Sequence, residues 1–190
     1  MTVAALDPKT TALVLIDLQH GIVAMPSQPR ASADVVANAA RIADRFRELG
    51  APVILVHVVM SGGARLALEV DEAMPARQLP PNAETIVEEL ATSDSDVIVT
   101  KRQWGAFYGT DLDLQLRRRG VRTIVLGGIS TNYGVETTAR DAWERNYNVV
   151  FAEDAMAARS AEDHAFAVTR IFPRIGRVSS ADEVLAALRD

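Results

Sequence analysis

The sequence predicts an α/β fold of three layers, in which helices cover both faces of a doubly wound, mainly parallel sheet of about six strands, as in Rossmann-like proteins. Two observations predict it. Short apolar runs alternate with amphipathic stretches along the whole chain. The runs are continuous, as in strands that are buried on both faces. The 190 residues contain no internal repeat or linker, so we expect one domain over residues 1–190.

The first half of the chain predicts two strands, a helix and a long loop. Thr11–Ile16 is a continuous apolar run, as expected of a buried strand. Ser32 opens a helical pattern that stops at Gly50, a residue suited to cap a helix. Pro52–Val59 is the second apolar run. After it, Ser61–Pro81 carries paired glycines and paired prolines, which predict a long loop at the functional edge.

The second half continues the alternation. Further strands are expected over Asp96–Thr100, Arg122–Leu126, Asn148–Ala152 and Ile175–Val178. Helices are expected from Asn82 to Leu90, from Thr110 to Gly120, from Tyr133 to Arg145, from Ser160 and from Ser180. Ser180 and Glu183 have the spacing of a capping box, and Thr110 with Asp113 has a weaker version of it.

Composition and charge exclude several functional classes. The net charge of −5 argues against nucleic-acid binding. No apolar run approaches the roughly 20 residues of a membrane-spanning helix, and Met1–Thr10 lacks a signal-peptide pattern, so we expect no membrane association and a cytoplasmic protein. The absence of cysteine excludes disulfides, thiolate metal sites and thiol nucleophiles. The histidines do not have metal-ligand spacing, and we expect neither a metal nor another cofactor.

Ligands of parallel α/β sheets bind beyond the carboxyl ends of the strands, near the switch in strand order. This rule selects Asp17 and Gln19 after the first strand, His57 at the end of the second, Lys101 after the third, Gly127–Gly134 after the fourth and Glu153-Asp154 after the fifth. A carboxylate and an ammonium at neighbouring strand ends can pair and shift each other's protonation. Such pairs are also common as purely structural features, so topology alone leaves both interpretations of Asp17 and Lys101 open. A single histidine such as His57 is more often structural.

Three stretches are distinctive as sequence motifs. They are Leu15–Gln19, Thr100–Arg102 followed by Ala106-Phe107 and Gly109-Thr110, and the long run Gly127–Ala142. Together they resemble the isochorismatase-like hydrolase superfamily, over nearly the whole chain. Most members are cysteine hydrolases, such as nicotinamidases and N-carbamoylsarcosine amidases, with an Asp–Lys–Cys triad. Asp17 and Lys101 match the first two triad members, and the cysteine position falls on Gly134.

The missing cysteine implies a hydrolase that forms no covalent thiol intermediate. True isochorismatases also lack this cysteine, and the resemblance implies vinyl-ether cleavage of a small anionic substrate, in which an Asp protonates the enol-ether carbon before water adds. Here Asp17 would be the acid, and Lys101 would position it and the charge of the substrate.

A nearby ammonium, however, lowers the pKa of a carboxyl group. Asp17 is therefore also a candidate base that activates water to hydrolyse another small amide, ester or ether. A catalytically silent, metabolite-binding oligomer is the third alternative.

The resemblance also implies how the rest of the pocket is built. In the family, the non-proline peptide bond at the position of Ile129–Ser130 is cis. It would aim the backbone N–H groups of Ser130 and Gly134 into the pocket, where they would stabilise an oxyanion or bind a carboxylate. Further pocket residues are expected at Gln19, Trp104, Phe107 and Tyr133. The expected partners are a small-molecule substrate and further copies of the chain in a homo-oligomer.

Overall fold

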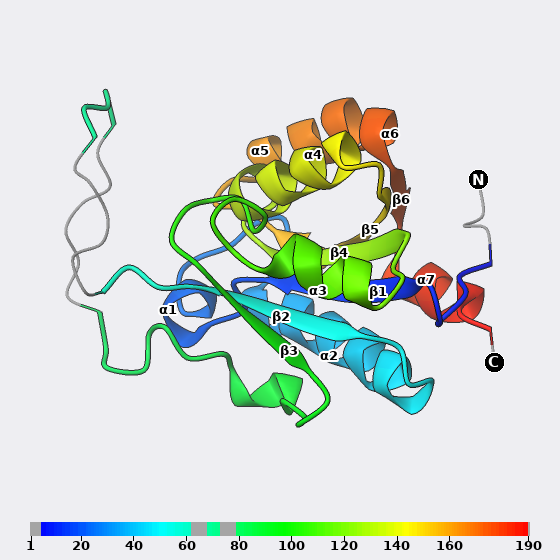
Figure 1. Cartoon of the computed structure of the whole chain (residues 1–190). Helices are drawn as coiled ribbons and strands as arrows, with labels where there is room; N and C mark the ends of the chain where they lie inside the picture. The colour runs from blue at the N-terminus through cyan, green and yellow to red at the C-terminus, as the bar shows by residue number, and fades with distance from the viewer. Residues whose placement is uncertain (1–4, 62–67, 73–78, 190) are drawn as a thin grey trace.

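Six parallel strands form one sheet, in the order β3-β2-β1-β4-β5-β6, in the computed structural model of the chain (Figure 1). The structure describes residues 5–61, 68–72 and 79–189. The strands are β1 (Thr11–Ile16), β2 (Val53–Val58), β3 (Val97–Lys101), β4 (Thr123–Ile129), β5 (Asn148–Ala157) and β6 (Arg177–Ser179). The strand order reverses between β1 and β4, so the predicted doubly wound sheet is confirmed and its switch point lies at these two strands.

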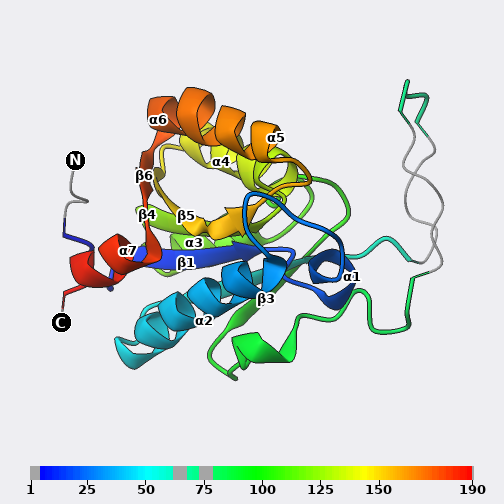
Figure 2. The same ribbon diagram turned by 180° about the vertical axis from the view of Figure 1, so that it is seen from behind.

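Helices cover both faces of the sheet (Figure 1 and Figure 2). They are α1 (His20–Val23), α2 (Ser32–Glu48), α3 (Leu112–Arg118), α4 (Glu136–Glu144), α5 (Ala161–Phe166), α6 (Phe172–Ile175) and α7 (Ala181–Ala187). Shorter turns are the 3-10 turn η1 (Glu88–Leu90) and the π-helical turns η2 (Thr131–Val135) and η3 (Ala167–Ile171). None of the helices in the described part of the chain has both the length and the apolar character of a membrane span.

Each face of the sheet has its own apolar core. On one side α2 and α7 pack against residues such as Leu13 and Leu15 of β1. On the other side α3, α4 and α6 pack against the alternate β1 residues Val14 and Ile16. Successive side chains of a strand point to opposite faces, so the continuous apolar run Thr11–Ile16 fills both cores. All six of its residues are buried.

The segment 82–90 differs from its prediction as one helix from Asn82 to Leu90. Only Glu88–Leu90 forms a helical turn. The preceding backbone pairs with the chain after β1: the N–H of His20 donates to the carbonyl of Thr85, and the N–H of Val87 donates to the carbonyl of Leu18. These long-range bonds use the groups that a local helix would need, and the pattern of the sequence does not reveal them.

Two helices also begin later in the chain than predicted. The hydroxyl of Thr110 donates to the carbonyl of Ala106 and accepts from the N–H of Leu112, so it stabilises a turn and α3 begins at Leu112. The helix expected from Tyr133 begins at Glu136, because the π-helical turn η2 precedes it. The capping box of Ser180 and Glu183 is confirmed at α7. Part of the long loop predicted over Ser61–Pro81 lies outside the described residues.

Candidate active site

Asp17 is the first residue after β1 and lies at the switch point of the sheet. Its backbone has φ 54°, a conformation that non-glycine residues rarely adopt and that is enriched at functional sites. The side-chain environment is dry, since Asp17 is only 6% exposed. The Oδ1 atom of Asp17 is buried and has no hydrogen-bond partner. A buried oxygen without a partner is costly, which marks this carboxyl group as a functional candidate.

Lys101 ends β3 and reaches across β2 to Asp17. Its Nζ lies 2.8 Å from Asp17 Oδ2, and the Lys101 side chain is 2% exposed. The same Nζ donates to the carbonyl of Gln103, at 3.0 Å, and to that of Trp104, at 2.8 Å. An ammonium group has three protons to donate, and these three contacts use them all. Lys101 therefore holds both Asp17 and the 102–104 loop, and any action on the charge of a substrate would be through its own positive charge.

The protonation of Asp17 depends on two opposing effects. Burial disfavours the ionised form, whereas the charge and hydrogen bond of Lys101 favour it. Burial is the larger effect and raises the pKa of Asp17 from 3.8 to about 6. The carboxyl group can therefore be present in either protonation state near neutral pH.

Gly134 lies directly against this pair. A Cβ atom added to Gly134 would stand 3.2 Å from Asp17 Oδ2, 3.4 Å from Lys101 Nζ and 2.9 Å from Ile16 Cγ2. The position at which the resemblance places a cysteine thus faces the carboxylate and the ammonium. It also has little room to spare for a side chain, because these distances are tighter than ordinary van der Waals contact.

The turn that carries Gly134 follows β4. The peptide bond between Ile129 and Ser130 is cis. The carbonyl of Ser130 accepts from the N–H groups of Tyr133 and Val135 and so closes the π-helical turn η2. Thr138 in α4 donates its hydroxyl proton to the carbonyl of Gly134 at 2.6 Å, which ties the turn to the following helix.

Gln19 and His57 are bound to the protein itself. The side-chain amide of Gln19 donates to the carbonyls of Val58 and Glu84 and accepts from the N–H of Val58. His57 has its Nδ1 at 3.0 Å from the carbonyl of Glu84 and its Nε2 at 2.7 Å from Thr100 Oγ1. Both side chains connect the ends of strands to the segment around Glu84.

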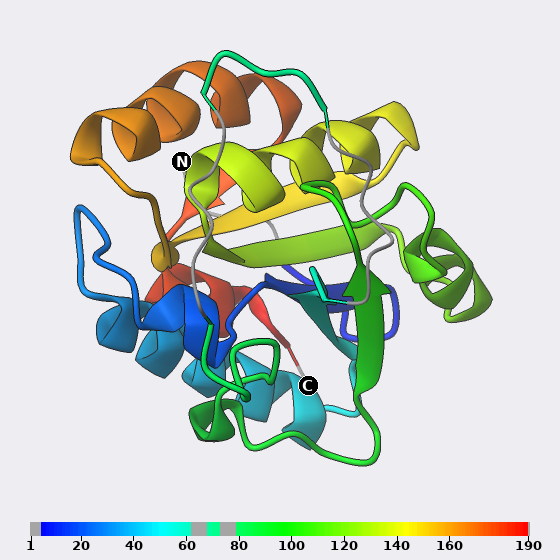
Figure 3. The ribbon, with the colours of Figure 1, turned by 90° about the vertical axis from the view of Figure 1, so that its left-hand side faces the viewer.

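The three aromatic residues that were expected in the pocket lie in two different places. Trp104 and Tyr133 are 53% and 42% exposed, and their ring centroids are 4.8 Å apart. Trp104 follows Lys101 closely and Tyr133 precedes Gly134, so this pair flanks the carboxyl edge of the sheet, which faces the viewer in Figure 3. Phe107 is instead 5% exposed and packs in the core, with its ring 6.0 Å from that of Tyr147.

One group of polar residues lies near the turn, and the strand-end rule had selected only one of them, Glu153. Thr131 Oγ1 lies 2.8 Å from His164 Nδ1, and His164 Nε2 lies 2.7 Å from Glu153 Oε1. The guanidinium of Arg30 donates to the same carboxylate at 2.8 Å. Hydrogen bonds from His164, and next those from Arg30 with its charge, lower the pKa of Glu153 to about 2. The four residues are distant in sequence, and the only sequence signal was an acidic residue after an apolar strand.

We expect Glu153→Gln to lower the free energy of unfolding by about 2 kcal/mol at pH 7, since the hydrogen bonds from His164 and Arg30 lose their charged acceptor. The folded-state pKa of Glu153 lies below its usual value of 4.5, so its stabilisation is present above pH 4.5 and is lost as the pH falls towards 2. Urea unfolding at pH 7 and pH 3 measures this, and the variant should differ less from the unmodified protein at pH 3. Glu48→Gln, which removes an exposed ion pair with Arg45, is the control and should cost less than about 1 kcal/mol. Equal effects of the two variants would contradict the expectation.

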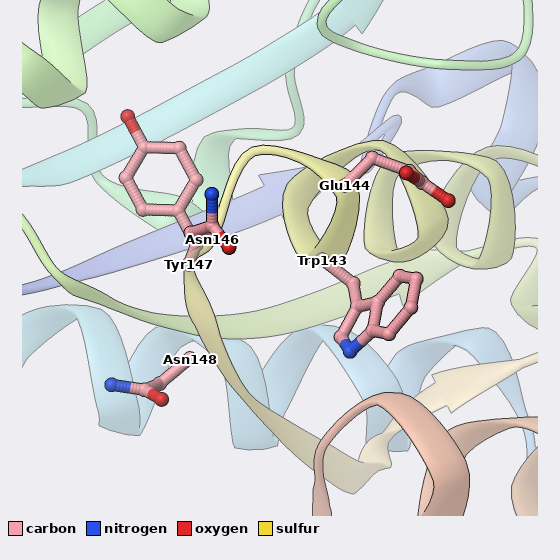
Figure 4. Close-up of a pocket in the computed structure, with 5 residues that line it drawn as sticks. All are labelled: Trp143, Glu144, Asn146, Tyr147 and Asn148. Atoms are coloured by element: carbon pink, nitrogen blue, oxygen red, sulfur yellow. The ribbon is translucent and has the colours of Figure 1, made fainter.

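A surface hollow in the described part of the chain lies elsewhere. It is lined by Trp143, Glu144, Asn146, Tyr147 and Asn148 (Figure 4). These residues end α4 and begin β5, so the hollow lies at the amino-terminal edge of the sheet, opposite Asp17. None of the predicted site residues lines it.

Comparisons with known proteins agree with this architecture. The isochorismatase domain model matches residues 11–183. The chain is 54% identical to the uncharacterized isochorismatase family protein YecD of Escherichia coli O157:H7, over 96% of this chain and 98% of that protein. It is 30% identical to the ureidoacrylate amidohydrolase RutB of Methylobacterium radiotolerans, over 97% of this chain and 81% of that protein. The structure of an isochorismatase family protein from Burkholderia thailandensis superposes with a TM-score of 0.91 at 49% identity, covering 98% of this chain and 99% of the other. The chain therefore belongs to the isochorismatase family.

Proposed function

We propose that the protein is a hydrolase of small anionic metabolites, with Asp17, Lys101 and the space beside Gly134 as its active site, and that no covalent intermediate forms. The observation that supports this proposal is the surroundings of the two carboxyl oxygens of Asp17. Its Oδ2 is held by Lys101, while its buried Oδ1 faces no protein partner. The chain contains no cysteine, and a proton from Asp17 requires no nucleophilic side chain.

Vinyl-ether cleavage of an isochorismate-type substrate uses the acid form of Asp17. Because Oδ2 accepts from Lys101, the proton of the neutral carboxyl group belongs on Oδ1, which can deliver it to the terminal carbon of the enol ether. Water then adds to the resulting oxocarbenium ion and returns a proton to the Asp17 carboxylate, and the neutral hemiketal separates into a keto acid and an alcohol. A raised pKa favours this role, since a carboxylic acid is an effective proton donor near its own pKa. In this proposal the backbone N–H groups of Ser130 and Gly134 bind the carboxylate of the substrate.

The ion pair with Lys101 favours a second candidate reaction. An ionised Asp17 can take a proton from water, which then attacks the carbonyl group of a small amide or ester. The similarity to a ureidoacrylate amidohydrolase, at 30% identity, supports including amides.

A substrate panel tests the proposal. Isochorismate, nicotinamide, carbamoyl amines and simple esters are incubated with the protein, and product formation is followed together with the intact mass of the protein. We expect one class to be hydrolysed with no mass added to the chain during turnover. A trapped covalent adduct would contradict the mechanism. Absence of turnover with the whole panel, combined with a ligand-induced rise in Tm, would favour the silent metabolite-binding alternative.

Gly134→Ala should lower kcat at least tenfold. The new methyl group would lie 3.2 Å from Asp17 Oδ2 and 2.9 Å from Ile16 Cγ2, so it displaces the carboxyl group and fills space beside it. Overpacking of this kind costs about 1–3 kcal/mol, which leaves the protein folded. Steady-state kinetics and thermal unfolding measure the two effects, and wild-type turnover by a folded Gly134→Ala variant would refute the assignment of Gly134.

A further inference from the structure

A line of polar side chains, partly buried at one end and fully buried at the other, ends on the turn that carries Gly134. It runs from Arg30 through Glu153 and His164 to Thr131, the first residue of η2. Thr131 is 0% and His164 is 3% exposed. Their side chains bond to one another and to Glu153, so an effect on the candidate site would be exerted through the turn.

The chemistry of Glu153 sets the direction of one hydrogen bond in this line. An ionised Glu153 can only accept, so His164 Nε2 carries the proton that it donates to Glu153. In the neutral imidazole the other nitrogen, Nδ1, is then an acceptor. The hydroxyl group of Thr131 then donates to His164, and with a protonated imidazole it would accept instead. A methyl group in its place could do neither.

The other end of the turn has little tolerance for movement. Gly134 is three residues after Thr131, and its ideal Cβ position lies 2.9–3.4 Å from Ile16, Asp17 and Lys101. A shift of the turn by a fraction of an ångström would therefore open or close the space beside the Asp17 carboxyl group. Displacements of about 1 Å can reduce catalysis about 100-fold even when they originate away from the reacting atoms.

We propose that Thr131, oriented by His164 and Glu153, is a positioning residue of the candidate active site: its hydrogen bond holds η2 so that Gly134 closes over Asp17 and excludes water from its carboxyl group. The kinetic part of this inference rests on the proposed function. The structural part does not, because water exclusion at Asp17 can be measured without a substrate.

The test compares Thr131→Val, which keeps the shape of the side chain but removes the hydroxyl group, with Thr131→Ser, which keeps the hydroxyl group. The carboxyl carbon of Asp17 is titrated by NMR in protein labelled at aspartate, with Asp17→Asn to assign the signal. Burial holds the pKa of Asp17 at about 6, so entry of water in Thr131→Val should lower it by at least one unit, towards 3.8. Thr131→Ser should titrate like the unmodified protein. With an active substrate, Thr131→Val should also lower kcat about tenfold or more at a nearly unchanged KM.

Thr169→Val is the matched control, because the hydroxyl group of Thr169 donates to the carbonyl of Ala165 on an exposed surface. It should change neither the titration nor the kinetics. If Thr131→Val does not fold, Thr131→Ala serves as a second variant without the hydroxyl group. The inference is overturned if a folded variant without the hydroxyl group titrates like the unmodified protein, or if Thr131→Ser shifts the pKa equally. If no substrate of the panel is hydrolysed, the proposed function is contradicted, but the titration of Asp17 in the Thr131 variants still tests this inference.

Discussion

Asp17→Asn should reduce turnover by a factor of about 100 to 10,000, the range that general acid–base catalysis contributes. An asparagine side chain neither gives nor takes a proton near neutral pH, so both candidate reactions lose their proton-transfer group. Its amide oxygen can still accept from Lys101, which lies 2.8 Å from the present carboxylate. The fold should therefore remain, and kcat/KM with the substrate that the panel identifies measures the loss.

The matched control for this variant is Asp94→Asn, at an exposed position between η1 and β3. It should retain full activity. Circular dichroism and Tm establish that both variants are folded. A folded Asp17→Asn protein with more than about a tenth of the normal activity would contradict the role of Asp17 as acid or base.

Gly128→Ala should have the largest effect on stability. Gly128 lies in β4 opposite Ile16 of β1, one residue before Asp17. Its φ is +124°, and an added Cβ would stand 2.1 Å from the carbonyl oxygen and 2.6 Å from the nitrogen of Ile16. Backbone atoms cannot move aside as a flexible side chain can, so the two central strands would separate. We expect a loss of more than about 4 kcal/mol, seen as little soluble protein or as a greatly lowered urea midpoint.

Gly120→Ala separates the steric clash from the backbone conformation. Gly120 also has a positive φ, +66°, but no atom lies within 4 Å of its ideal Cβ position. Its replacement should cost only about 1–2 kcal/mol, the penalty of a left-handed conformation. Similar losses in both variants would mean that close approach of β1 and β4 is not what requires a glycine at position 128.

Local patterns were sufficient to predict most of the fold. The run Thr11–Ile16 was predicted with its correct bounds, because a strand buried on both faces has a continuous apolar signature. The Ser180–Glu183 cap was predicted because it involves neighbours in sequence. The segment 82–90 was mispredicted because its backbone pairs with residues that are about 65 positions away. The residue pattern of the segment favours a helix, but it does not show that its backbone will pair with a distant part of the chain.

In the candidate site too, some features could be predicted from the sequence and others depend on long-range contacts. The strand-end rule and the family resemblance together predicted that Asp17, Lys101 and Gly134 would lie together. The saturation of Lys101 by two backbone carbonyls could not be predicted, since it depends on the path of the 102–104 loop. The Thr131–His164 bond spans 33 residues, and only the three-dimensional packing of α5 on η2 reveals it.

The most direct measurement of the central claim, that Asp17 is a buried acid which donates a proton, is the pH dependence of kcat/KM. The protonated form is the active one in this account, and burial sets its pKa at about 6. The rate constant should be level below pH 6 and fall about tenfold for each unit above it. A rate constant that instead rises through pH 6 to a plateau would show that the ionised carboxylate is active, and would contradict the acid role in favour of the base.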